Sequence, residues 1–245
     1  MPFLFGRGFS YAAGLIGATL TLPESVVRSD LEQPHAGMLL YADPDHHVSH
    51  QVRLALAEKQ IAYQLIVVDA RVRPEDLLDL NPYASLPTLI DRELRLYQNM
   101  VILEYLEERY HKHRLLPDHP ASRAEFRQYA WRIQHDWLSL ADTLLTHPDS
   151  LDIAAAQHAR QQLRNSLISL APLFAKRPFF MNDQFGLCDC LLAPMLWRLP
   201  EMQIELPSSL AAPLLAYCQR LFERPAFLAT LTVQQRQKRD LPRIG

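Results

Sequence analysis

Four residues between positions 46 and 50 carry side chains that can do chemistry. His46, His47 and His50 can bind a metal ion or donate hydrogen bonds, and Ser49 adds a hydroxyl. His46 and His50 are four residues apart, so on a helix they would lie on one face, as two metal ligands do. However, a cation at a helix N-terminus meets the positive end of the helix dipole, and no carboxylate or thiolate accompanies these histidines in sequence. We therefore expect no metal site, a solvent-facing loop position for His46, and a helix-capping role for Ser49.

The cysteines suggest neither a disulfide framework nor a redox site. There are three of them, Cys188, Cys190 and Cys218, and a low, odd number favours a reducing compartment. Cys188 and Cys190 lie two residues apart in a helical pattern, so their side chains point to different faces and are poorly placed to share a metal. We expect buried, apolar cysteines in a cytoplasmic protein.

Charge gives no reason to expect contact with nucleic acid. The formal net charge is −2, from 25 basic and 27 acidic residues. Binding to nucleic acid depends on neutralising phosphates, which requires a local excess of lysine and arginine. The nearest candidate is a short basic tail of the kind that is usually solvated, formed by Arg236, Lys238, Arg239 and Arg243. We therefore expect no direct nucleic-acid binding.

The first 37 residues precede any clear element. Residues 9–22 form an apolar run that is too short to span a bilayer as a helix. Arg7 ahead of the run gives it a faint likeness to a signal peptide, but no small-residue cleavage motif follows. We expect residues 1–37 to be a disordered extension, or to follow an upstream start codon that is not used. We also expect no membrane association.

From Met38 the chain alternates between strand and helix patterns. Strand-like runs lie at 38–41, 61–68, 86–90 and 94–97, and helical patterns lie at 48–56, 75–80 and 102–110. The first half of this order is a βαβ unit, which favours parallel pairing, and the last two strands are close enough for a hairpin. These patterns predict an α/β domain over residues 38–115.

Beyond a proline-containing linker no strand pattern recurs. Apolar helical stripes follow at 123–145, 163–174, 187–199, 210–222 and 227–239. They predict an all-helical domain over residues 120–240. With 49% hydrophobic residues, the chain can bury a sizeable core without disulfides or a structural metal.

This organisation resembles the glutathione-transferase superfamily, in which a thioredoxin-like domain precedes a helical domain. The segment 49–59 resembles the first helix of the superfamily, and 81–89 resembles the segment before its third strand, which contains a cis proline. Within the superfamily the chain is most similar to the stringent starvation protein A family of bacterial regulators associated with RNA polymerase. The strings that carry this similarity lie at 48–53, 79–82, 91–94, 193–200 and 222–224, and Leu-Trp-Arg-Leu-Pro at 196–200 is the most specific.

The resemblance implies a ligand cleft lined by His46, Ser49, Leu86, Pro87, Gln98 and Asn99. Enzymes of the superfamily stabilise a thiolate with a serine, cysteine or tyrosine near the first helix, and in the serine and cysteine classes that position is occupied here by His46. They also place an acidic residue and then serine at the start of the helix after the fourth strand. Here the pair is Gln98-Asn99: neutral Gln98 weakens an ammonium contact, and Asn99 is a good N-cap. The two departures predict no catalytic residue, no transferase activity and no cofactor, with binding of glutathione left open.

The resemblance also implies a capping box at the start of the sixth helix of the superfamily. The family pattern is Ser or Thr, then two residues, then Asp, and here it reads Gly186-Leu-Cys-Asp189. Asp189 can still bond back to the backbone of the N-cap, whereas the reciprocal hydroxyl is missing. This feature marks the fold rather than a chemical site.

RNA polymerase holoenzyme is the partner that the resemblance implies, with a homodimer or a pairing with a related chain. In the family the partner-facing surface reads aromatic-Pro-His-Pro at the end of the third helix, and the prolines are absent here. The partner-binding candidates in this sequence are Arg92, Tyr110, His111, Lys112, His113 and His119. Their donors and positive potential would suit an acidic polymerase surface. We predict a transcription regulator; a glutathione-dependent transferase, a small-anion sensor and a merely solvated linker stay open as alternatives.

Overall fold

A computed structural model describes residues 37–69, 75–146 and 152–240. The expected N-terminal extension, apart from Gly37, lies outside these residues. Within them, no helix is both long enough and apolar enough to cross a membrane.

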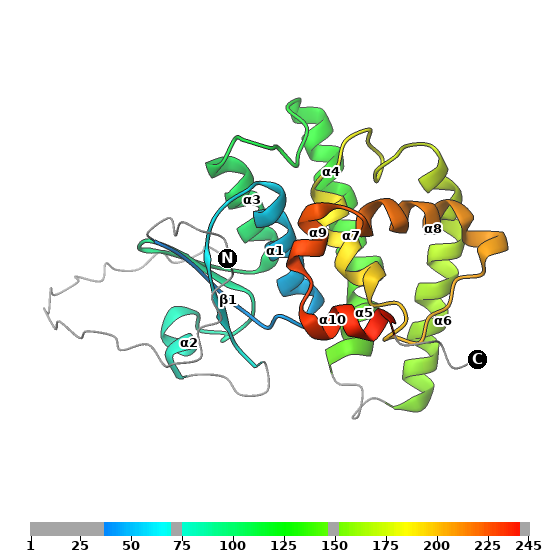
Figure 1. The fold of residues 1–245 in the computed structure, drawn as a ribbon, viewed down its shortest axis with the longest axis horizontal. Helices are drawn as coiled ribbons and strands as arrows, with labels where there is room; N and C mark the ends of the chain where they lie inside the picture. Colours follow the sequence, from blue (N-terminus) through cyan, green and yellow to red (C-terminus); the bar gives the residue numbers. More distant parts are fainter. Residues whose placement is uncertain (1–36, 70–74, 147–151, 241–245) are drawn as a thin grey trace, which may run out of the picture.

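The N-terminal part is a four-stranded mixed sheet with helices packed beside it (Figure 1). Its strands follow the order β2-β1-β3-β4, with β1 at Met38–Ala42, β2 at Gln64–Val67, β3 at Thr88–Asp91 and β4 at Leu94–Tyr97. β1 and β2 pair in parallel, and β3 pairs antiparallel with β1 and β4. The predicted βαβ unit and hairpin are confirmed. β2 is shorter than the predicted strand because Ile61 still closes the preceding helix, where its N–H donates to the carbonyl of Leu56.

The C-terminal part is helical throughout the residues described. α4 (Pro120–Ile133) runs through a π-helical turn at Gln134–Leu138 into α5 (Ser139–Thr146), and together these form the predicted helix 123–145. The helices that follow are α6 (Ile153–Leu170), α7 (Leu187–Trp197), α8 (Ser208–Phe222), α9 (Pro225–Thr230) and α10 (Val233–Asp240). The predicted fold class, an α/β thioredoxin-like domain followed by an all-α domain, is confirmed.

Helix α1 (His47–Glu58) is the central element between the two parts. It contacts α3 (Asn99–Arg109) in the sheet domain and α7 and α9 in the helical domain (Figure 1); α2 (Glu75–Leu80) lies apart from it beside the sheet. Every residue of α1 from Ser49 to Leu56 is buried, polar ones included. A helix buried on all faces must satisfy its polar side chains with partners from its neighbours. These partners, described below, define the cleft region.

One hydrophobic cluster extends from the sheet through α1 into the helical domain. It includes Leu40 on β1, Leu56 on α1, Leu191 on α7 and Tyr217 on α8. All three cysteines belong to the same cluster and are buried thiols, as the sequence predicts. Burial raises the pKa of Cys190 well above its usual value, so this thiol stays protonated near neutral pH.

Asp189 organises the start of α7. Its carboxylate accepts hydrogen bonds from Gly186 N (2.7 Å), Phe180 N (2.9 Å) and the hydroxyl of Tyr217 (2.6 Å). The predicted bond from the N-cap backbone to Asp189 is therefore present. Burial raises the pKa of Asp189 to about 6, against the three hydrogen bonds, which lower it.

Gly186 shows why the family's capping hydroxyl is missing. A Cβ at this position would lie 3.0 Å from the backbone oxygen of Leu115, which is itself fixed by a 2.8 Å bond from Leu187 N. We expect Gly186→Ser to lower the free energy of unfolding by about 1 kcal/mol, because a crowded Cβ costs more than the few tenths gained from a cap. Urea denaturation would measure the change. A serine variant more stable than the parent would contradict this explanation.

Candidate functional site

The loop before β3 has the backbone geometry implied for the cleft. The Leu86–Pro87 peptide bond is cis, as the resemblance predicts, and Pro87 is buried at the start of the strand. The side-chain amide of Asn81 binds Ser85 and the hydroxyl of Thr88, which fixes the loop from behind.

His46 is the N-cap of α1, not a solvent-facing loop residue. Its Nδ1 accepts a hydrogen bond from Val48 N at 3.3 Å, and its ring stacks on His47 with 4.8 Å between ring centroids. The sequence suggested Ser49 as the cap. However, the helix begins two residues before Ser49, so Ser49 cannot cap it. Ser49 is fully buried, and its hydroxyl has no hydrogen-bond partner among the described residues.

The protonation of His46 limits what it can do for a thiol. Burial, and next the charge of His47, lowers the pKa of His46 from 6.5 to about 4, although Asp142 raises it. The imidazole is therefore neutral near pH 7. Because Nδ1 accepts the bond from Val48, the proton is on Nε2, which faces Asp142 at 3.8 Å. His46 therefore has no positive charge with which to stabilise a thiolate.

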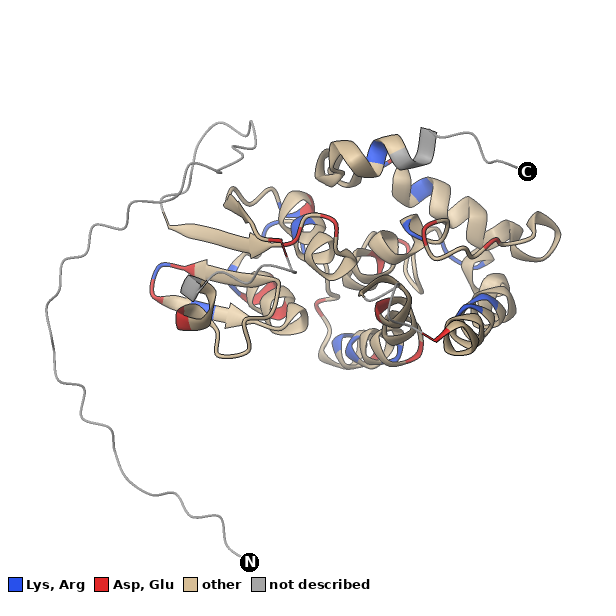
Figure 2. Ribbon diagram, turned by 90° about the horizontal axis from the view of Figure 1, so that it is seen from below, with Lys and Arg blue, Asp and Glu red and all other residues tan. Residues whose placement is uncertain are grey.

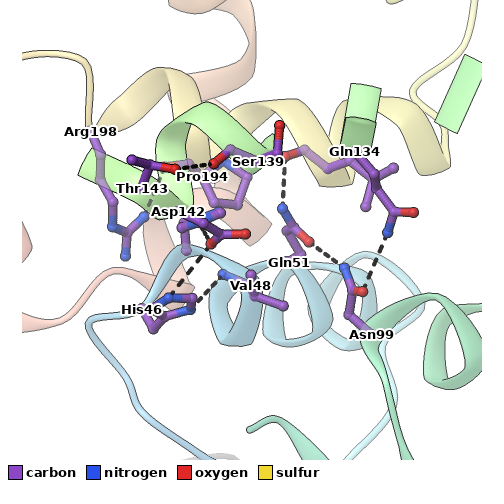
Figure 3. A network of polar contacts seen from close by, with 12 residues as sticks. His46, Val48, Gln51, Asn99, Gln134, Ser139, Asp142, Thr143, Pro194 and Arg198 are labelled. Carbon is purple, nitrogen blue, oxygen red and sulfur yellow. Dashed lines mark hydrogen bonds and ion pairs between the residues drawn. The ribbon is translucent and has the colours of Figure 1, made fainter. Parts of the chain in front are cut away.

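Asp142 on α5 enters this region from the helical domain. Its carboxylate is 2.7 Å from Nε2 of His47, whose side chain is fully buried. Figure 3 shows Asp142 lying directly above His46 across the domain boundary. Sequence reasoning missed this residue, since it is 95 positions from His47 and nothing local distinguishes it from other acidic residues on a helix.

His50 points away from His46 and His47. Its Nε2 donates to the hydroxyl of Thr230 at 2.9 Å, since that hydroxyl itself donates to the carbonyl of Phe227. Its Nδ1 faces the guanidinium of Arg198 at 3.3 Å. His50 therefore does not belong to the cluster of His46, His47 and Asp142. Burial, then the charges of Arg53 and Arg198, lowers the pKa of His50 well below 6.5.

Gln98 and Asn99 also differ from the expectation. Gln98 is exposed, has a positive φ of 73° and occupies the N-cap position of α3 without a side-chain cap bond. Asn99 is the first helical residue rather than the cap. Its amide donates to Gln51 at 2.6 Å and accepts from Gln134 at 3.4 Å, while Gln51 donates to the carbonyl of Leu191 (Figure 3). This chain of amides joins the sheet domain to the helical domain.

The predicted partner surface lies at the end of α3. His111, Lys112 and His113 are exposed, and Tyr110 is half-buried beneath the guanidinium of Arg109. Arg92, in the turn between β3 and β4, is close enough for its charge to act on Tyr110: burial and Asp91 raise the pKa of that phenol, whereas Arg109 and Arg92 lower it. We call Arg92 together with Tyr110, His111, Lys112 and His113 the linker surface.

In sequence, His119 lies beyond the linker surface. It is exposed immediately before α4, separated from Lys112 by the buried Leu115 and Leu116. Figure 2 shows lysines and arginines distributed over both domains rather than collected on one element.

A buried ion pair fixes the linker surface from below. Lys59 and Glu107 meet at 2.8 Å with both side chains almost wholly buried. Lys59 also donates to the carbonyl of His113, and the Glu107 carboxylate accepts from the backbone N–H groups of Leu115 and Leu116. Sequence reasoning missed this pair as well; the one available indication was a glutamate next to Leu106 on the apolar face of a helix.

Comparison with known proteins identifies the folds of both domains. Residues 47–109 match the family model "Glutathione S-transferase, N-terminal domain", and residues 136–225 match "Glutathione S-transferase, C-terminal domain". The stringent starvation protein A homolog of Pasteurella multocida is 40% identical over 196 residues, which cover 80% of this chain and 91% of the relative.

Two further comparisons concern glutathione itself. Glutathione S-transferase GstB of Escherichia coli is 29% identical, covering 72% of this chain and 88% of that protein. The structure of Ure2p in complex with S-hexylglutathione superposes with a TM-score of 0.72 at 20% identity. The superposition covers 82% of this chain and 100% of the chain in that structure. The second likeness shows the fold alone.

Proposed function

The chain belongs to the stringent starvation protein A family of the glutathione-transferase superfamily, and on that premise we propose that it is a transcription regulator that binds RNA polymerase holoenzyme. The observation that carries this proposal is the linker surface, which lies where the family resemblance implies the partner contact. Its backbone is fixed by Lys59 and Glu107, and a surface ordered before binding loses little conformational entropy in the complex.

The chemistry of the linker surface suits an acidic partner. Arg92 and Lys112 are exposed cations, and His111 and His113 are exposed donors beside them. Complementary charge at an interface raises the association rate and the specificity. We place the protein in the cytoplasm, in keeping with its free cysteines, and as a homodimer or in a pair with a related chain.

The cleft supports the proposal that this protein does not transfer glutathione. His46 is neutral and turned toward Asp142, Gln98 lacks a charge, and both ends of the Asn99 amide have protein partners. None of these groups supplies the positive potential that would lower a thiol pKa from about 8.5 to near neutral.

Retention of RNA polymerase holoenzyme on the immobilised protein tests the main proposal. We expect retention at low salt, and a loss of affinity of about tenfold or more in the double variant Arg92→Glu, Lys112→Glu, because both rim charges would then repel an acidic partner. Lys176→Glu is the matched control, since Lys176 is an exposed lysine of the helical domain outside the linker surface. Absence of retention by the parent protein, or equal retention by the double variant, would contradict the proposal.

The cis Pro87 and the similarity to GstB favour a second candidate, a glutathione-dependent transferase. Turnover of glutathione with standard electrophiles, abolished by His46→Ala or Ser49→Ala, would establish that activity instead. Binding of glutathione or another small anion without turnover would indicate a sensor.

A further inference from the structure

The cluster at the N-terminus of α1 has the composition of a metal site. Among the described residues, His46, His47 and Asp142 place their ligand nitrogens and oxygens within 4.8 Å of one another. We infer that these three residues bind one divalent transition-metal ion, with zinc the best match. Two imidazoles and one carboxylate form the ligand set of open zinc sites, in which the fourth position is left to water or another small ligand. The inference does not depend on the binding of RNA polymerase.

Of the two distances from the histidines to Asp142, one is shorter and one is longer than the separation of neighbouring ligand atoms in a tetrahedral site. Zinc bonds of about 2.0–2.1 Å place neighbouring ligand atoms roughly 3.3 Å apart. Here Nε2 of His47 lies 2.7 Å and Nε2 of His46 lies 3.8 Å from the same oxygen of Asp142. To complete the geometry, Asp142 must shift by about 1 Å, and the ring of His46, now stacked on His47 at an interplanar angle of 30°, must turn so that both Nε2 lone pairs point at the ion. Asp142 can make this shift because its side chain is 47% exposed, whereas burial holds the ring of His47 in place.

Binding changes the proton position on both imidazoles and breaks two hydrogen bonds. A neutral histidine that binds metal through Nε2 carries its proton on Nδ1. His46 therefore gives up the long 3.3 Å bond that Nδ1 accepts from Val48, and His47 gives up the proton it shares with Asp142. Asp142 supplies the negative charge that the histidine sequence lacks.

Three effects oppose binding. Nδ1 of His47 is buried and has no hydrogen-bond partner among the described residues, so a proton there reduces the affinity by about fivefold or more. The loss of a capping bond typically reduces the affinity for zinc about fivefold, and repulsion by the helix dipole reduces it by a similar factor. Structural zinc sites bind with a Kd of about 50 nM or lower, so a combined loss of about 100-fold leaves binding in the micromolar range. Arg198 is a nearby cation, but its charge acts on His46 less than that of Asp142, and its guanidinium already binds the carbonyls of Asp45 and Pro194.

The ion would connect the two domains, since the histidines begin α1 and Asp142 belongs to α5. Isothermal titration of the full chain with zinc, after removal of metal by a chelator, tests the inference. We expect saturation at one ion per chain, a zinc-dependent rise in melting temperature, and intense visible bands of four-coordinate cobalt when cobalt replaces zinc.

Variants separate this site from other histidines on the surface. We expect His46→Ala and Asp142→Asn each to weaken zinc binding by at least about tenfold and to abolish the cobalt bands. Asp142 and His46 are partly exposed, so both variants should fold. His135→Ala is the control, because this exposed histidine stacks on Trp131 instead and should leave the affinity unchanged. No saturable binding by the parent chain, or equal affinity in the Asp142→Asn variant, would overturn the inference.

Discussion

Replacing Glu107 with glutamine is expected to lower the free energy of unfolding by about 3–5 kcal/mol. The substitution keeps the size of the side chain but leaves the Lys59 ammonium buried without a counter-charge, which is the costly way to break a buried ion pair. The neutral amide also accepts less strongly from the N–H groups of Leu115 and Leu116. Urea denaturation of the two proteins at one pH would measure the difference.

Glu108→Gln is the matched control for this experiment. Glu108 is the next residue on α3 but is exposed, so its neutralisation should change the stability by no more than about 0.5 kcal/mol. Hydrogen exchange adds a local measurement: the amides of Leu115 and Leu116 should exchange much faster in Glu107→Gln. If both variants are equally stable, the ion pair does not anchor the linker surface. If Glu107→Gln is folded but retains polymerase fully, the anchoring has no part in binding.

Acidification from pH 7.5 to 5 is expected to lower the free energy of unfolding through His50. In the folded protein burial and the neighbouring arginines hold the pKa of His50 well below 6.5, whereas in the unfolded chain it takes its ordinary value. Between these two values the unfolded state binds the extra proton, so stability falls as the pH decreases below 6.5. Each pH unit below that point costs about 1.4 kcal/mol, and above it the contribution is fully present.

The slope with pH, rather than the stability at any one pH, identifies His50. We expect His50→Gln to be less stable at neutral pH but to lose less stability than the parent on acidification. Asp189 acts in the opposite direction, because its pKa is raised to about 6 and its protonation favours the folded state at low pH. Asp189 is common to both proteins and cancels in the comparison. Chelator in all samples removes any contribution from bound metal. Parallel profiles for the two proteins would show that His50 is protonated without cost.

Local patterns in the sequence were sufficient for most of the fold. The helix at 75–80 and the strand at 94–97 have the predicted bounds, because turn residues flank both and hydrophobic periodicity is a property of neighbouring residues. Pro87 lies directly before a strand and its peptide bond is cis, as the resemblance of residues 81–89 implied. β2 was overestimated because β-branched residues at 61–68 satisfy a strand pattern even where the backbone is still leaving a helix.

The polar contacts of the site were not predictable in the same way. His46 was expected in solvent and Ser49 as a cap, since hydroxyls are the commoner caps and the cap was placed three residues late. Asp142, Thr230 and Arg198 meet the histidines only after both domains have packed, and they lie 95, 180 and 148 positions from their partners. No local pattern contains information about such pairings.

The polar residues of α1 have a consequence for how the protein folds. His47, His50, Gln51 and Arg53 each find a partner in the helical domain, at Asp142, Thr230, Leu191 and Thr230 respectively. A fragment ending near Pro117 would expose the apolar face of α1 and strip these side chains of their partners. The protein should therefore unfold in a single cooperative transition rather than domain by domain. An exchange of its N-terminal half with that of a relative would succeed only if α1 and its four contacts were transferred as a set.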